Sequence, residues 1–325
     1  MADNKNSNLK IKERSKQRQG IYAIFISLVI WIITVVSFYT AGYFKQLEET
    51  SLLSNTVLIG LGAGIVVFLM ASARENHLYD YDNQENYGRF FLFFLLSLIL
   101  SIGFSWLPAA GWSYLAIFIC LSLFSNTLIG VSAGSVLLFL TVILSGAGTV
   151  TFLFYFFCGL AGAVLFGRLD ENYHIGVPLI SSILLMIVGE TAGVVLYTNE
   201  KLGIELFLVS FMNIIITTIL LMVTLKLYSS LVVHRYRNKY MEINDTECPL
   251  LIQLKQCSRE EYYQAVHTAY FCDRIAKRLG LNVAAVKTGG YYHKIGKLAG
   301  ENSWESVRKA GEEFGFPPAA TQILR

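Results

Sequence analysis

Charged residues are scarce in this sequence and are missing from its middle. Only 15% of the 325 residues are Asp, Glu, Lys or Arg, whereas soluble domains average about a quarter. The stretch 90–167 contains none of the four, while 235–325 is rich in them. This excludes an ordinary soluble domain for the first part of the chain. The composition predicts a membrane part followed by a soluble part.

Paired cysteines and a large net charge are also absent. The five cysteines form no C-x-x-C pair, and we expect them to be ordinary packed thiols, reduced where they lie in the cytosol. The net charge is only +3, and the basic residues cluster at the ends of the chain. We interpret these clusters as orientation signals and expect no nucleic-acid partner.

Long apolar segments fill the first part of the chain. The hydrocarbon core of a bilayer is about 30 Å thick, so a spanning helix needs about 20 apolar residues. Turn signals at Pro108–Gly111, Gly130–Gly134 and Gly146–Gly148 divide the charge-free stretch into four segments. We therefore predict an all-α, polytopic membrane domain over 21–229. Its eight or so spans are expected near 21–43, 52–73, 90–107, 112–130, 131–147, 149–167, 177–198 and 206–229.

Basic residues at both ends of this domain predict its orientation. The N-terminal segment 1–20 carries six Lys and Arg residues against two acidic ones, and the linker 230–246 follows the last span with His234, Arg235, Arg237 and Lys239. The positive-inside rule places both segments in the cytoplasm, which requires an even number of spans. We expect a multi-pass protein of a bacterial inner membrane that contacts the lipid bilayer.

One acidic residue, Glu190, lies well inside the seventh predicted span. A charge at the centre of a membrane helix costs about 2.5–3.5 kcal/mol on insertion scales. Two interpretations remain open. The carboxyl group either contacts an ion or ligand inside the bundle, or it is protonated or paired with polar side chains and helps the helices associate.

Residues 247–325 have the pattern of a small all-α domain. A short apolar helix follows Pro249, and Ser258 with Glu261 three residues later is a helix start of the capping-box type. That helix should end at Gly280. Further helices are expected after Asn282, over about 304–314 and after 317–318.

The helix expected after Asn282 carries the run Tyr291–Lys297, which reads Tyr-Tyr-His-Lys-Ile-Gly-Lys. This resembles Y-Y-H-D-I-G-K, the signature of the HDIG branch of the HD phosphohydrolases. The match is closest to the seven-transmembrane HD phosphohydrolases of bacteria, whose known activity is hydrolysis of cyclic di-AMP. The resemblance covers 247–325 by motif, as a partial HD domain, and the membrane part by architecture. The family's extracytoplasmic sensor domain has no counterpart between the first two spans.

The resemblance implies metal-assisted hydrolysis of a phosphodiester, in which two cations hold the phosphate and generate hydroxide. The first histidine of the family's site falls on Gln264, and the HD pair falls on His293 and Lys294. A later histidine falls near Ser303. Gln offers only a neutral amide to a transition metal, and Lys294 brings a positive charge to the position of the bridging carboxylate.

Two other residues are candidates near this site. His267, three residues after Gln264 on the same helix face, is a possible substitute metal ligand, although a surface or core histidine is the simpler interpretation. Lys297 matches the family's lysine near the substrate phosphate. A divalent metal, manganese or iron, is expected only if the family's site is retained.

Three functions remain open from the sequence. The first is a catalytically degenerate HDIG protein with a sensing or regulatory role, which binds a cyclic dinucleotide or another partner. The second is an active, metal-dependent phosphodiesterase. The third is a transporter-like membrane protein with a regulatory HD remnant. A homo-oligomer is possible in each case.

Overall fold

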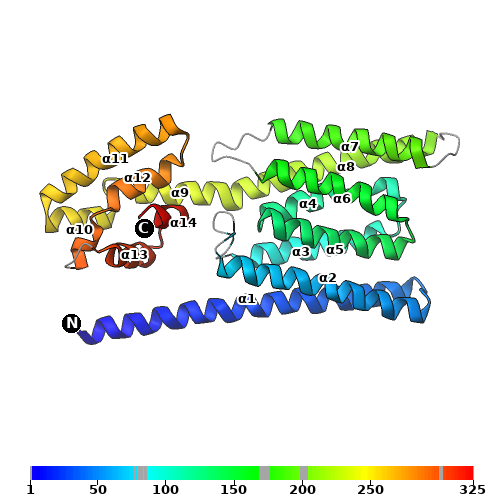
Figure 1. The fold of residues 1–325 in the computed structure, drawn as a ribbon, viewed down its shortest axis with the longest axis horizontal. Helices are drawn as coiled ribbons and strands as arrows, with labels where there is room; N and C mark the ends of the chain where they lie inside the picture. The colour runs from blue at the N-terminus through cyan, green and yellow to red at the C-terminus, as the bar shows by residue number, and fades with distance from the viewer. Residues whose placement is uncertain are drawn as a thin grey trace. The chain divides into compact units, whose positions relative to one another are not determined.

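The computed structural model describes residues 2–76, 78–79, 83, 86–167, 176–197, 204–299 and 303–324. Within these ranges the side chains of 2–21, 189–197, 204–207, 299, 304, 308, 312–313 and 318 are not described. Every regular element in these ranges is a helix (Figure 1). The chain divides into two compact units, Met1–Tyr228 and Ser229–Arg325. The prediction of an all-α fold is confirmed for the described residues.

The first unit contains the apolar helices. They are α1 (Ala2–Phe44), α2 (Glu49–Glu75), α3 (Tyr87–Phe104), α4 (Tyr114–Leu123), α5 (Thr127–Ser145), α6 (Thr149–Phe166), α7 (Gly176–Tyr197) and α8 (Ile204–Tyr228), with a 3₁₀ turn, η1 (Ala109–Gly111), before α4. Six described helices are long and apolar enough to cross a membrane: Tyr22–Phe44, Glu49–Glu75, Tyr87–Phe104, Thr127–Ser145, Thr149–Phe166 and Leu208–Ile243. A multi-pass membrane protein is therefore the architecture that this unit supports.

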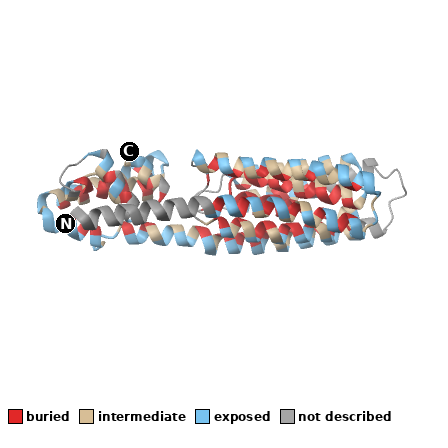
Figure 2. Cartoon of the chain, turned by 90° about the horizontal axis from the view of Figure 1, so that it is seen from below, coloured by how far each residue is buried: buried red, intermediate tan, exposed pale blue. Residues whose placement is uncertain are grey.

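Helix α4 is the centre of the first unit. All ten of its residues are buried, and it packs against α5, α6 and α8. In Figure 2 the buried residues of the unit gather in its interior, while the outward faces of the helices are more exposed. With a rise of 1.5 Å per residue, α4 is about 15 Å long, which is half the thickness of the hydrocarbon core.

The structure corrects the predicted boundary between the fourth and fifth spans. We expected 112–130 and 131–147, with a turn at Gly130–Gly134, but the break lies at 124–126 and both glycines are inside α5. Asn126 caps α5 by accepting a hydrogen bond from the amide of Ile129 (2.8 Å). The two glycines allow close packing instead, because a Cβ atom at Gly130 would overlap the backbone of Ser122 on α4.

Hydrogen bonds at the two ends of this bundle fix the direction of its helices. At one end, the Lys45 ammonium after α1 donates to the carbonyls of Ser105 (2.5 Å) and Leu144 (3.0 Å), at the ends of α3 and α5. Burial lowers the pKa of Lys45. At the other end, the Asn126 amide donates to the Leu78 carbonyl (3.1 Å), beside the loop after α2. Helices α3, α4 and α5 therefore alternate in direction.

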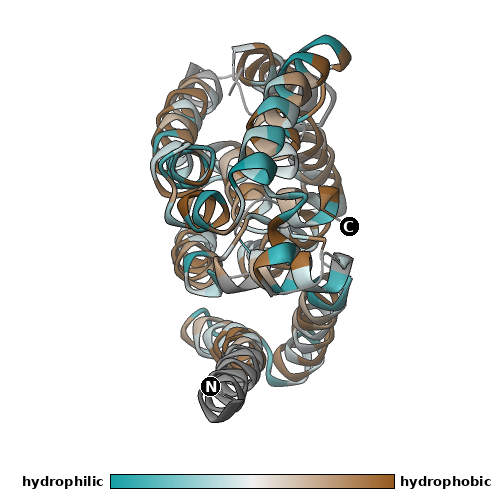
Figure 3. Cartoon of the chain, turned by 90° about the vertical axis from the view of Figure 1, so that its left-hand side faces the viewer, coloured by the Kyte–Doolittle hydropathy of each residue, from teal (hydrophilic) through white to brown (hydrophobic). Residues whose placement is uncertain are grey.

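The second unit forms a helical domain with its own core. It contains a π-helical turn, η2 (Ser229–Val233), then α9 (His234–Ile243), α10 (Pro249–Cys257), α11 (Arg259–Leu279), α12 (Val283–Tyr292), the 3₁₀ turn η3 (Ile295–Ala299), α13 (Trp304–Glu313) and α14 (Pro318–Ile323). Its helices carry both hydrophilic and hydrophobic residues (Figure 3). Ser258 caps α11 and Gly280 ends it in the left-handed conformation (φ 65°), which confirms both predicted signals.

The predicted linker, 230–246, is part of the second unit. Most of it forms η2 and α9, and the end of α9 is fastened to α12 by three hydrogen bonds. The Tyr292 hydroxyl donates to the Ile243 carbonyl (2.7 Å). The Asn244 amide donates to the Ala284 carbonyl (3.1 Å) and accepts from the Thr288 hydroxyl (3.0 Å). We expected 230–246 to be a linker, but the buried side chains of Tyr240 and Ile243 hold α9 against the domain.

Candidate functional site

The candidate site lies where the end of α12 meets the first half of α11. Gly290 brings these helices together, because a Cβ atom there would lie 2.6 Å from the Cα of Ala269. Helix α12 ends at Tyr292, and His293 and Lys294 follow in a turn before η3. We expected the whole Tyr291–Lys297 run on one helix. The turn instead directs Lys294 and Lys297 to residues of α11.

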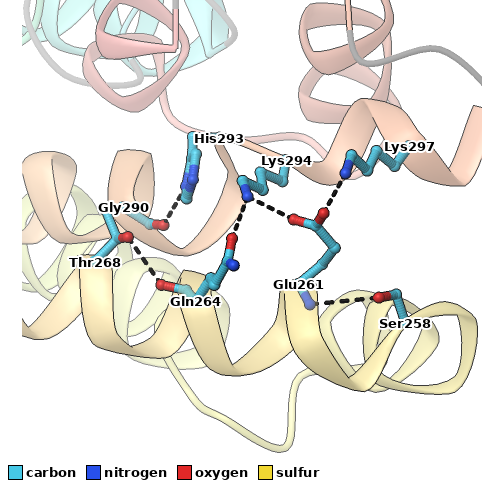
Figure 4. A network of polar contacts seen from close by, with 8 residues as sticks. All are labelled: Ser258, Glu261, Gln264, Thr268, Gly290, His293, Lys294 and Lys297. Carbon is cyan, nitrogen blue, oxygen red and sulfur yellow. Dashed lines mark hydrogen bonds and ion pairs between the residues drawn. The ribbon is translucent and has the colours of Figure 1, made fainter.

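Four polar side chains form one network in this place (Figure 4). The Lys294 ammonium donates a hydrogen bond to the side-chain oxygen of Gln264 and pairs with the Glu261 carboxylate at 2.7 Å. The other carboxylate oxygen of Glu261 pairs with Lys297. The hydrogen bonds from Lys294 and Lys297 lower the pKa of Glu261 below its ordinary value of 4.5. We call Glu261, Gln264, Lys294 and Lys297 the lysine network.

His293 lies beside the lysine network, with its ring turned to the backbone of α12 (Figure 4). Its Nδ1 atom is 2.7 Å from the Gly290 carbonyl oxygen. If Nδ1 carries the proton, as this geometry favours, the acceptor nitrogen is Nε2. His293 thus keeps one ring nitrogen that can bind a ligand.

A cavity of about 430 Å³ adjoins His293. Its polar lining residues are His293, Thr268, Cys272 and Ser303, and the rest of the lining is glycine and aliphatic, from Val286, Gly289, Gly290, Val307, Ile323 and Leu324. Burial raises the pKa of the Cys272 thiol, so this cysteine is not an activated nucleophile. Both the size and the mostly apolar lining are in the range of small-molecule sites.

The residues present do not fit a two-metal centre. Among the residues that the structure describes, no three His, Cys, Asp or Glu side chains gather to hold a metal ion. An ammonium group 4 Å from a divalent cation is repelled by roughly 8 kcal/mol at an effective dielectric constant of about 20. Lys294 would exert this repulsion on a metal held by Gln264 and His293. We therefore derive no metal-dependent step from this site.

The remaining predicted residues fall outside the network. His267 is exposed on α11, and in the described part of the chain it does not line the cavity. It therefore receives no support as a substitute ligand. Glu190 belongs to α7, but its side chain lies outside the described residues, so both interpretations of it stay open.

Glu261 is the site residue that the sequence analysis missed. We assigned it only to the helix cap, where its backbone amide does donate to the Ser258 hydroxyl (3.4 Å). Its carboxylate instead bridges the two lysines, and its side chain is only 16% exposed. The spacing of Glu261 and Gln264, three residues apart on a helix, places them on one face and was the available signal.

Comparisons with known proteins give no relative for this chain. No family model, no curated protein and no solved structure matches it. The similarity to the HDIG phosphohydrolases therefore stays a hypothesis that rests on the residues quoted above.

Proposed function

We propose that this chain is a membrane-anchored regulatory protein derived from HDIG phosphohydrolases, whose C-terminal domain has lost its metal centre and binds its ligand without hydrolysing it. The lysine network is the observation that carries this proposal. The ammonium group of Lys294 lies between Gln264 and Glu261. In the HDIG phosphohydrolases, which the motif resembles, the residue at this position is the Asp that binds the metals. The ligand site is the cavity beside His293, and a cyclic dinucleotide is the ligand that the family resemblance suggests.

The proposal includes the placement of the chain in a bacterial inner membrane. We propose eight crossings, six by the long apolar helices and two by the shorter apolar helices Tyr114–Leu123 and Gly176–Val188. The alternating direction of α3, α4 and α5 supports a crossing at α4, and the residues that flank α4, 112–113 and 124–126, add to its length. Both ends of the chain would then lie in the cytoplasm.

The test is a metal and activity measurement on the full-length protein, purified in detergent. After incubation with manganese or iron and removal of excess metal, elemental analysis should find no stoichiometric metal, and cyclic di-AMP should stay intact. Equilibrium dialysis with cyclic di-AMP should nevertheless show saturable binding. Hydroxide generation needs a metal that lowers the pKa of water from 15.7 towards about 7, and this site lacks the ligands for one.

Variants at the two altered positions sharpen this test. Lys294→Asp or Gln264→His alone should not restore metal binding, because other ligands are still missing. The double variant should bind metal weakly, since it gains an imidazole and a carboxylate and loses the ammonium group. Two metals per chain and rapid cleavage by the unmodified protein would favour the alternative function, an active phosphodiesterase. An absence of saturable binding would refute the proposed ligand.

A further inference from the structure

Helix α11 has apolar residues on both of its faces. Its inner face packs into the domain through Tyr262, Ala265, Ala269 and Ala276, which are all buried. Its outer face nevertheless exposes large apolar side chains, which continue into the turn before α12: Tyr263, Tyr270, Phe271, Ile275, Leu279 and Leu281. Phe271 is 61% exposed and Leu279 is 66% exposed. Exposed apolar patches of this kind mark interaction surfaces.

The charges on this outer face are mostly positive. Over 270–281 the sequence contains three cations, Arg274, Lys277 and Arg278, and one carboxylate, Asp273. Asp273 is already paired with Lys277 at 2.7 Å. The Arg274 guanidinium lies 4.7 Å from the centre of the Tyr270 ring, so an aromatic ring and a cation form one combined surface. We call the exposed side chains of 270–281 the basic apolar face.

We propose that the basic apolar face docks on the surface of an anionic lipid bilayer. Aromatic and aliphatic side chains beside Lys and Arg are the composition of helices that lie in the headgroup region, where the apolar groups enter the acyl boundary and the cations meet lipid phosphates. Docking would cover the exposed rings and neutralise Arg274 and Arg278 together. This inference does not depend on the function of the lysine network.

Two features favour a bilayer over a second copy of this chain. In a two-fold contact the same patch meets itself, so a face that carries Arg274 and Arg278 would meet a second face of the same net positive charge. The chain itself also keeps this domain near lipid. Only the 15 residues of η2 and α9 separate α8 from Asn244, and a helix of that length covers about 22 Å. The bilayer is therefore present at a high effective concentration.

The test is photo-crosslinking of the full-length protein in phosphatidylglycerol nanodiscs. Benzoylphenylalanine replaces Phe271 in one variant and Phe314 in a control variant. Phe314 follows α13 and is 45% exposed, so it is accessible without belonging to the basic apolar face. After irradiation, mass spectrometry should find lipid adducts at position 271 several-fold more often than at position 314. Adducts should decrease in phosphatidylcholine nanodiscs, at high salt and in the Arg274→Gln/Arg278→Gln variant.

The other outcomes would overturn the proposal. Crosslinks from position 271 to a second chain would identify this face as a contact between copies. Equal lipid adducts at 271 and 314 would show only general proximity to the bilayer, and no adduct at 271 would show that lipid does not cover the face. Both substituted side chains are exposed, so neither substitution disturbs the core of the domain.

Discussion

Glu261 holds together residues that are distant in sequence. Its carboxylate receives one ammonium group on each oxygen, from Lys294 and Lys297, and these contacts connect α11 to the turn after α12. The same helix contains a second ion pair, between Asp273 and Lys277, but its partners are four residues apart and Lys277 is 63% exposed. The ion pairs of Glu261 connect two elements, whereas the pair of Asp273 lies within one helix and is more accessible to solvent. A substitution of Asp273 is therefore a matched control for a substitution of Glu261.

We expect Glu261→Gln to destabilise the protein at neutral pH more than Asp273→Asn does. Because the folded-state pKa of Glu261 is lowered from 4.5 by its lysine partners, its contribution to stability is fully present above pH 4.5. That contribution disappears as the pH falls through the lowered folded-state pKa. Calorimetric unfolding of the full-length protein should thus show a deficit for Glu261→Gln that shrinks below pH 4.5. A deficit that is independent of pH, or equal to that of Asp273→Asn, would contradict this role.

Among the helices, the contacts of α4 depend on glycine. Gly130 and Gly134 on α5, with Gly159 and Gly162 on α6, leave room for the side chains and backbone of α4. Membrane helices have no hydrophobic driving force towards one another, so close packing of small residues supplies much of their association. The completely buried position of α4 follows from these small residues.

A methyl group at Gly130 should therefore destabilise the membrane unit. Gly130→Ala would push against the backbone of Ser122, which cannot move aside as a flexible side chain can, and overpacking of this kind costs about 1–3 kcal/mol. Gly103→Ala is the control, because a Cβ atom there meets no described atom within 4 Å. Thermal unfolding in detergent should show a lower midpoint for Gly130→Ala only. Equal midpoints for the two variants would show that α4 and α5 are not in close contact.

The sequence predicted helix ends better than helix contacts. Ser258 and Gly280 act on their own helix, through a side-chain cap and a left-handed backbone, and both signals were correct. Gly130–Gly134 was read as a turn because glycine interrupts helices in water, whereas here it serves a contact with α4, which a local pattern does not reveal. The bridge from Glu261 to Lys297 joins positions 36 residues apart, and for the same reason only the structure shows it.

For the molecule as a whole, the proposed eight crossings place the exposed thiol of Cys257 in the cytoplasm. A membrane-impermeant maleimide applied to intact cells should not label Cys257, which is exposed, and should label it after lysis. A cysteine at position 10 should behave in the same way. Gln46→Cys, in the turn after α1, should be labelled in intact cells because one crossing separates it from the N-terminus. Labelling of Cys257 from outside, while position 10 stays protected, would require an odd number of crossings.

Lys294 also determines how the C-terminal domain depends on its surroundings. A metal ion dissociates, and the occupancy of its site follows the supply of that metal; its binding free energy is part of the folding free energy of the protein. The Lys294 cation is attached to the backbone and stays in place when metal is scarce. Chelators should therefore leave the melting temperature of this protein unchanged. In a cell starved of manganese or iron, this domain would stay folded, whereas enzymes whose folding depends on a bound metal would lose that metal and its contribution to their stability.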